Sequence, residues 1–151
     1  MKRENIAHFT SQSVWGMIGL TIVTLTFYFP FWLRKTSRIV NDLLPTNRIG
    51  AGFFPISIML TIINLGMVIP EIMTNDDRTV VMMSKLANLL DGLVILVWSF
   101  KIRNRINLIL EAENPSRLWF NAVWTFLFQL FYIQFRINRI KKAEQPASGD
   151  A

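Results

Sequence analysis

The chain has no cysteine and a single histidine, His8, among its 151 residues. The absence of cysteine excludes disulfide bonds, thiolate nucleophiles and metal sites with cysteine ligands. One histidine cannot build a histidine-rich metal site, and without cysteine it cannot form a cysteine–histidine catalytic pair.

Other catalytic patterns are also missing. The chain contains no glycine-rich phosphate loop, no metal-ligand spacing and no set of nucleophile, base and orienting residue. We therefore expect a protein without enzymatic activity, without a cofactor and without a metal ion.

Apolar residues are abundant instead, because they make up 52% of the chain and the mean hydropathy is +0.35. This balance is too apolar for an ordinary soluble domain of this size. A hydrocarbon core about 30 Å thick needs about 20 helical residues, so two apolar runs are long enough to cross and two are borderline. The sequence predicts an all-α integral membrane protein with four membrane-embedded helices. The runs are Val14 to Leu33, Phe53 to Ile72, Leu86 to Phe100 and Leu118 to Phe135.

A single domain accounts for this pattern. Residues 1–13 form a polar segment, residues 14–142 form the four-helix membrane domain, and residues 143–151 form a tail that should be disordered. Within the first run, Pro30 lacks a backbone donor and should kink or end the helix.

Two polar stripes at helical spacing run through the second and third apolar runs. If these runs form an antiparallel hairpin, Asn64 lies level with Asp91, and Glu71 lies level with Ser84 and Lys85. Because polar groups in hydrocarbon need internal partners, we expect a hydrogen bond between Asn64 and Asp91 and an interfacial Glu71–Lys85 pair. The stripes consist of Ser57, Thr61, Asn64, Val68 and Glu71, and of Ser84, Asn88, Asp91, Ile95 and Trp98.

Asp91 is the leading candidate for chemistry, because an ionisable side chain in the middle of a membrane helix indicates function. It could relay a proton or bind a cation together with Asn64 and Asn88. The alternative is a structural aspartate that holds the hairpin together. The alternative is favoured, because proton and ion pathways need a chain of such groups and no second deep carboxylate lies nearby.

Basic residues follow the apolar runs and produce the formal net charge of +6. Beside runs of bilayer length, such clusters suit anionic lipid headgroups better than nucleic acid. We expect these segments, for example residues 33–44, to be basic amphipathic extensions that lie at the membrane interface. The predicted headgroup ligands are Arg34, Lys35, Arg38, Lys101, Arg103, Arg105, Arg136 and Arg139, and the predicted aromatic anchors are Trp32, Trp98, Trp119 and Tyr132.

The segment from Thr24 to Arg38 resembles the signature of a family of small bacterial membrane proteins, a domain of unknown function. That signature, T-L-G-x-Y-G-x-Y-W-x-x-K, closes the first hydrophobic segment, and Thr26 and Phe29 occupy its glycine positions here. The matching residues are Thr24, Leu25, Tyr28, Phe31, Trp32 and Lys35. The resemblance implies a multi-pass protein of the bacterial inner membrane and brings no known activity.

Membrane topology is left open by the charges. Four simple crossings place 8 Lys and Arg residues on each side, so the positive-inside rule does not decide the orientation. The basic segments 34–48 and 101–117 favour the cytoplasm, and the acidic turn 71–77 favours the outside. A fourth run that enters the membrane and returns would also place the basic residues 136–142 in the cytoplasm.

Three functions are compatible with these features. The chain is a non-enzymatic interaction or scaffold subunit of a membrane complex, a small oligomeric ion or proton conductor that uses Asp91, or a lipid-binding protein that shapes membranes. Four helices of this size bury little internal surface, which favours other membrane subunits or further copies as partners. We expect the first function, with contacts to anionic lipid and none to nucleic acid.

Overall fold

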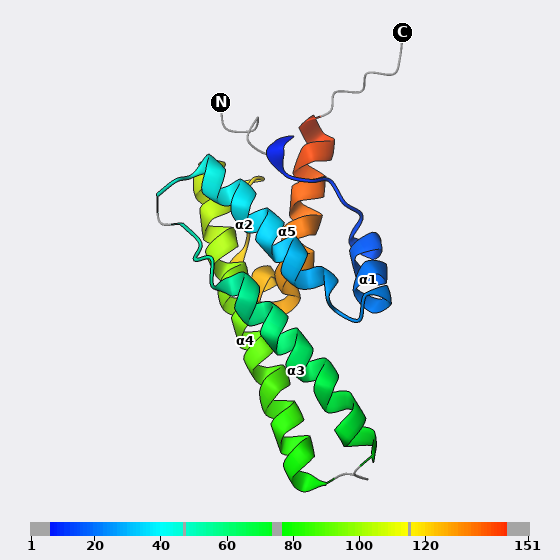
Figure 1. Ribbon diagram of the computed structural model, residues 1–151. Coiled ribbons are helices and arrows are strands. Elements are labelled where there is room, and N and C mark those ends of the chain that lie inside the picture. The colour runs from blue at the N-terminus through cyan, green and yellow to red at the C-terminus, as the bar shows by residue number, and fades with distance from the viewer. Residues whose placement is uncertain (1–6, 47, 74–76, 115, 145–151) are drawn as a thin grey trace.

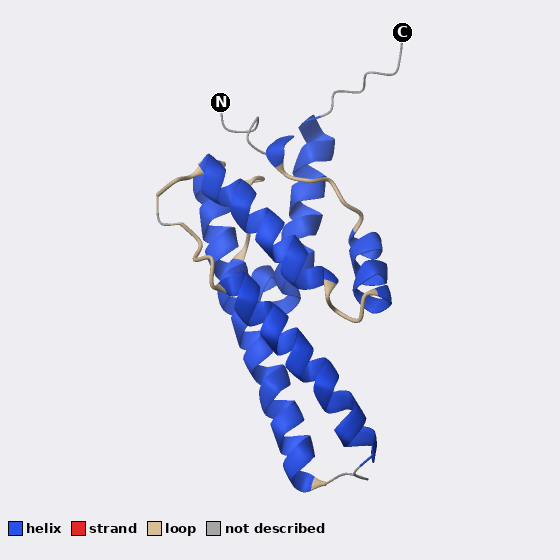
Figure 2. Ribbon diagram, viewed as in Figure 1, coloured by secondary structure: helices blue, strands red, loops and turns tan. Residues whose placement is uncertain are grey.

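In the computed structural model, the described residues are 7–46, 48–73, 77–114 and 116–144, and they form five α-helices without a β-strand. The predicted all-α fold class is confirmed. The helices are α1 (Val14–Val23), α2 (Tyr28–Leu43), α3 (Phe53–Met73), α4 (Arg78–Ile109) and α5 (Ala122–Glu144), as Figure 1 and Figure 2 show.

Polar side chains fix where two of these helices begin. Asp77 Oδ1 accepts a hydrogen bond from the backbone N–H of Thr79 at 2.8 Å, directly before α4. Asn121 Oδ1 accepts one from the backbone N–H of Val123 at 2.8 Å, directly before α5. Such N-caps satisfy amide groups that the first turn of a helix leaves without an intrahelical acceptor.

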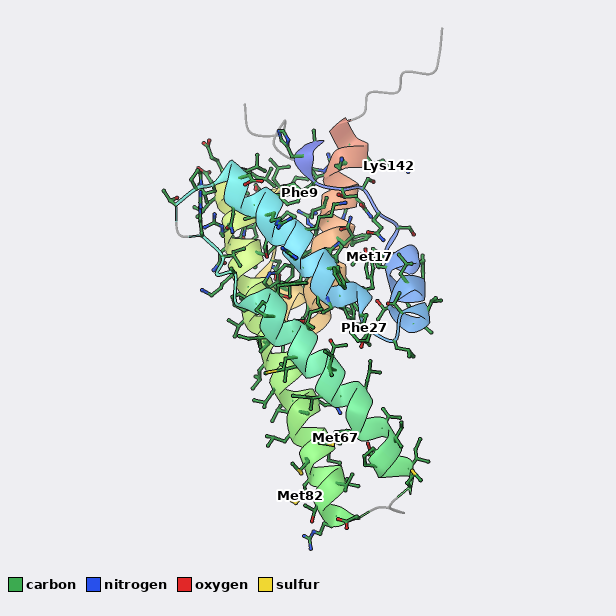
Figure 3. All side chains as sticks on the ribbon, in the orientation of Figure 1. Phe9, Met17, Phe27, Met67, Met82 and Lys142 are labelled. Carbon is green, nitrogen blue, oxygen red and sulfur yellow. The ribbon has the colours of Figure 1, made fainter. Side chains whose placement is uncertain are left out.

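The molecule has two parts, which Figure 1 separates clearly. We call α3 and residues 78–97 of α4 the hairpin, and residues 7–46 together with 98–144 the head. The hairpin projects from the head as two adjacent antiparallel helices (Figure 1). Figure 3 shows Met67 and Met82 on the hairpin, whereas Phe9, Met17 and Lys142 lie in the head.

The main hydrophobic core lies in the head. Its centre is Trp98, which is 0% exposed and packs against Trp32 from α2. Buried aliphatic residues of α4 and α5 surround this pair because their apolar positions recur at helical spacing. The buried members of the cluster include Met17, Leu33, Val40, Ile102, Ile106, Phe120, Ile133 and Ile137.

Among the described residues, two helices and not four are long and apolar enough to cross a membrane, judged by length and composition. They are α3, with 21 residues, and α4, with 32 residues. Only 17% of the most apolar window of α3 and 11% of that of α4 are buried. The expectation of four membrane-embedded helices is therefore corrected to two helices of crossing length.

The first apolar run does not form one helix of crossing length, because the chain turns between Val23 and Tyr28. Leu25 and Thr26 have positive φ values of 48° and 70°, which no α-helix accommodates. Pro30 does not cause this break, contrary to prediction. It lies in the first turn of α2, where the missing N–H of proline costs no intrahelical hydrogen bond.

The fourth apolar run does not form a helix of crossing length either, for a different reason. The helix α5 begins only at Ala122, so Leu118 to Asn121 are not part of it. Gln129 has φ 42° and ψ −120°, which kinks α5 in the middle of the apolar run. Beyond the kink the helix carries Arg136 and Arg139, and no 18-residue window remains sufficiently apolar.

The N-terminal segment contacts α5 where the structure describes it. Lys141 Nζ donates hydrogen bonds to the backbone carbonyls of Ala7 at 3.2 Å and Phe9 at 2.6 Å. Residues 143 and 144 of the predicted disordered tail belong to α5, while residues 145–151 lie outside the described residues. Residues 1–6 of the predicted polar segment also lie outside them.

Candidate functional site

The candidate site is the polar seam of the hairpin, and one hydrogen bond fixes its register. Ser84 Oγ donates to Glu71 Oε2 at 3.0 Å, so these residues lie level as the sequence predicts. Seven residues along either helix correspond to about 10.5 Å and almost two full turns. Asn64 and Asp91 therefore also lie level with each other and on the facing sides of α3 and α4.

Small polar residues allow the two helices of the seam to pack closely. Ser57 and Thr61 on α3 and Ser84 and Ala87 on α4 are buried between the helices. Thr61 Oγ1 donates to the carbonyl of Ser57 at 2.9 Å, within its own helix. This arrangement is typical of helix pairs in membranes, where small residues permit close backbone approach.

Asn64 and Asp91 lie level, but they do not form the hydrogen bond that the sequence predicts. The Oδ1 atoms of both side chains are buried and have no hydrogen-bond partner. Burying such an atom without a partner costs free energy, and this cost is unusual in a native fold. The middle of the hairpin therefore contains two acceptor oxygens that receive no hydrogen bond from the described residues.

Asn88 lies at the edge of the same seam and is exposed. Its Nδ2 donates to the carbonyl of Ser84 at 3.0 Å, one turn earlier in α4. Lys85 is also exposed, and the described residues include no ion pair between Lys85 and Glu71. Glu71 binds Ser84 in place of the predicted lysine partner.

The predicted headgroup ligands divide into two groups. Exposed side chains that remain available to lipid headgroups are Arg34, Lys35, Arg38, Lys101 and Arg139. Arg103 and Arg136 are half-buried and donate to backbone carbonyls, since Arg103 Nε binds Phe120 O at 2.7 Å and Arg136 Nη2 binds Trp119 O at 3.0 Å. These two arginines hold the segment before α5 in place.

Arg105 is buried and binds the end of α2. Its Nη1 donates to Thr46 O at 2.6 Å, and its Nη2 donates to the carbonyls of Leu44 and Val40. The last carbonyls of a helix lack intrahelical donors and carry partial negative charge. A guanidinium supplies both the missing hydrogen-bond donors and a positive charge. Burial lowers the pKa of the Arg105 guanidinium. Arg105 thus contacts protein, whereas the sequence assigns it to lipid.

Trp32 and Trp98, predicted as interfacial anchors, are core residues of the head. Their rings meet edge to face with centroids 5.4 Å apart. Trp98 Nε1 donates to Ser37 Oγ at 2.8 Å, and Trp32 Nε1 donates to Gln134 Oε1 at 3.2 Å. Both indole rings contact protein side chains, whereas the sequence predicts contacts with lipid headgroups.

Trp119 and Tyr132, the other two predicted anchors, are half-buried. The guanidinium carbon of Arg103 lies 5.3 Å from the Trp119 ring centroid. Tyr132 Oη accepts a hydrogen bond from Asn121 N at 2.9 Å. Both side chains therefore support the segment that leads into α5.

The sequence interpretation missed Gln134 and Asn138, which organise the head. Gln134 Nε2 donates to Thr10 O at 3.0 Å and to Asn138 Oδ1 at 2.8 Å, and Asn138 Nδ2 donates to Gln12 O. The sequence signal that could have indicated this role is the i, i+4 spacing of the two amides on the apolar face of a helix. Together they bind the N-terminal segment to α5.

The structure therefore defines an all-helical protein with a head and a two-helix hairpin of membrane-crossing length. The family model for a domain of unknown function (DUF4234) matches residues 12–108, and the chain belongs to that family. The matched range contains α1, α2, α3 and nearly all of α4, while α5 lies beyond it. Comparisons with curated proteins and with solved structures gave no match.

Proposed function

We propose that this protein is a non-enzymatic integral-membrane interaction subunit whose hairpin crosses the membrane and binds the helices of a protein partner. The observation that carries the proposal is the exposed apolar surface of the hairpin together with an exposed amide and an exposed glycine, Asn88 and Gly92, on one flank of α4. The partner is a further copy of the chain or another membrane subunit.

The dimensions of the hairpin suit a bilayer. At about 1.5 Å per residue, the 21 residues of α3 extend about 31 Å, close to the thickness of the hydrocarbon core. Large apolar side chains point outward along both helices, and lipid tails would cover them at no cost. They include Ile62, Ile69, Ile72, Met82, Leu86 and Leu93.

Charge favours a cytoplasmic head in a bacterial inner membrane. The head presents the exposed cations Arg34, Lys35 and Arg38, and Lys101 follows the open end of the hairpin. Basic segments next to a membrane helix stay in the cytoplasm and attract anionic headgroups. The connection between α3 and α4 would then lie on the outer side.

A flank of α4 offers a surface for a partner helix. Lys85, Asn88 and Gly92 follow one another at i, i+3 and i+7, and all three are exposed. A Cβ atom added to Gly92 would meet nothing within 4 Å, so another backbone can approach there. Interhelical contacts in membranes use such small residues together with amide hydrogen bonds, which the Asn88 side chain would supply.

Photocrosslinking in native membranes tests this proposal. A benzophenone amino acid at position 88 should give one discrete protein adduct, either with a second copy or with one other membrane protein. The matched control replaces Leu93, which is exposed about 140° around α4 from Asn88 and should give no discrete protein adduct. Equal crosslinking at both positions, or none at position 88, would contradict the proposal.

A further inference from the structure

A groove with a volume of about 550 Å³ lies along α5 in the head, with Val14 of α1 at its edge. It continues into a second hollow of about 290 Å³ beside the segment that precedes α5. Trp124, Tyr132, Arg136 and Arg139 line both hollows, so the two form one groove. This volume lies within the range of sites for small amphiphilic molecules.

One end of the groove is aromatic and apolar. Phe128, Phe131 and Phe135 from α5 line it, and Val14 closes it from α1. Trp124 stacks on Phe128 with centroids 5.7 Å apart and an interplanar angle of 21°. Phe128 and Phe135 are about half exposed, so their rings offer apolar surface that the chain itself does not cover.

The other end of the groove is basic. Arg136, Arg139 and Arg117 line it, and no carboxylate is among its lining residues. Arg136 uses Nη2 to bind the carbonyls of Arg117 and Trp119, and its buried Nε has no hydrogen-bond partner. Burial lowers the pKa of Arg136, the nearby Tyr132 hydroxyl raises it, and the positive charge of Arg139 lowers it further. The two guanidiniums therefore repel each other, and the lining residues supply no carboxylate to pair with either of them.

We propose that this groove binds one anionic phospholipid, whose phosphate contacts Arg136 and Arg139 and whose acyl chains pack against Phe128, Phe131 and Phe135. A free phosphate would leave the aromatic walls uncovered, and a neutral lipid would leave the two arginines without a counter-charge. An anionic phospholipid satisfies both ends at once.

The kink at Gln129 brings the two parts of α5 together around this groove. Trp124 and Phe128 precede the kink, whereas Arg136 and Arg139 follow it, and Trp124 and Arg139 line both hollows. The aromatic and the basic side chains of α5 are therefore close enough to contact the same lipid molecule. The inference goes beyond the proposed association, and it holds whether or not the hairpin has a protein partner, because the groove lies in the head.

Fluorescence quenching by brominated phospholipid tests the site, since Trp124 lines the groove. The full chain is placed in phosphatidylcholine nanodiscs, and brominated phosphatidylglycerol is titrated as the probe. We expect saturable quenching at low mole fractions, whereas brominated phosphatidylcholine should quench weakly and without saturation. Trp124→Phe should remove most of the saturable signal. Equal quenching by the two lipids would overturn the proposal.

Two groove variants and one control make the result specific. Arg139→Gln, at an exposed side chain, should raise the half-saturating mole fraction of phosphatidylglycerol about five-fold. Phe135→Ser should weaken binding from the apolar end of the groove. Arg38→Gln, which removes an equally exposed arginine from α2, should leave binding unchanged.

Other outcomes would refute a lipid site. Equal weakening by Arg38→Gln and Arg139→Gln would mean that net charge alone attracts the lipid. Displacement of the brominated lipid by millimolar inorganic phosphate would mean that the groove recognises only a free anion.

Discussion

The head and the hairpin differ in how their apolar side chains pack. The main core cluster lies in the head, whereas large apolar side chains are exposed along both helices of the hairpin. Buried polar groups do not follow this division. In the head, the indole N–H groups of Trp32 and Trp98 reach acceptors on Gln134 and Ser37, but Ser99 Oγ and Arg136 Nε have no hydrogen-bond partner among the described residues. In the hairpin, Ser84 Oγ binds Glu71, but the Oδ1 atoms of Asn64 and Asp91 have no partner there either.

This difference indicates which part of the chain has a hydrophobic core of its own. An apolar surface is stable when water is kept away from it. The head keeps water away from the Trp32–Trp98 pair with its own residues. The hairpin leaves large apolar side chains exposed along both helices, so its stability depends on its surroundings, which we propose are lipid and a second protein.

The largest predicted effect comes from the centre of the head. Trp98→Ala should lower the free energy of unfolding by about 3 to 5 kcal/mol, because it leaves a cavity and removes the hydrogen-bond donor of Ser37 Oγ. Thermal unfolding followed by circular dichroism in a mild detergent measures it. Trp15→Ala is the control, since Trp15 is 81% exposed and its loss should change little. Similar effects of the two substitutions would mean that the head has no fixed core.

A substitution of Arg105 tests whether the head uses its own side chains to bind the last backbone carbonyls of α2. Arg105→Gln should cost about 1.5 to 3 kcal/mol, because charge-assisted bonds to the carbonyls of α2 are lost. Amide hydrogen exchange should accelerate near the C-terminal end of α2 and remain unchanged in α5. Lys101→Gln, at an exposed position one turn earlier in α4, should change stability by no more than about 0.5 kcal/mol. If Arg105 binds lipid, as the sequence predicts, the variant would lose lipid without local acceleration of exchange.

Thr26 tests the turn that shortens the first apolar run. Its φ of 70° disfavours a β-branched side chain by about 1 to 2 kcal/mol, and glycine adopts this conformation freely. Thr26→Gly should therefore stabilise the protein by about 1 kcal/mol after the entropy of the unfolded glycine is deducted. Position 26 is also a glycine position in the signature that the segment resembles.

Thr24 provides the control for this turn. Its φ is −92°, and its Oγ1 accepts a hydrogen bond from Tyr28 N at 3.0 Å. Thr24→Gly should therefore destabilise the protein in the same thermal unfolding experiment. A loss of stability in both variants would mean that residues 24–27 do not adopt this turn.

The sequence predicted the register of the hairpin, although not the Asn64–Asp91 and Glu71–Lys85 contacts, because the signals for register are local. Polar residues at helical spacing fix the facing sides of α3 and α4, and equal rise per residue fixes the register that the Ser84–Glu71 bond confirms. The helical class of the protein follows from the same periodicity.

The head was predicted poorly because its structure depends on contacts between distant segments. Whether Trp32 meets a headgroup or Trp98, and whether Arg105 meets lipid or the end of α2, depends on how α2, α4 and α5 pack. The break at Thr26 was also hidden, because threonine gives no sign of a positive φ. Composition describes a run as apolar but does not show where its helix ends.

The smallest predicted effect concerns Asp91. Substitutions there test whether the polar seam of the hairpin is structural or conducts protons or cations. Asp91→Asn keeps the shape of the side chain and its ability to form hydrogen bonds, so assembly should remain nearly intact. Asp91→Leu should not destabilise the hairpin, because it removes a buried acceptor oxygen that has no hydrogen-bond donor. Flux of protons or cations into reconstituted vesicles is the second measurement. We expect little flux from the native chain and little change with Asp91→Asn. A strong native flux that this substitution abolishes, while circular dichroism shows an intact fold, would refute the interaction subunit and establish a conductor that uses the carboxylate.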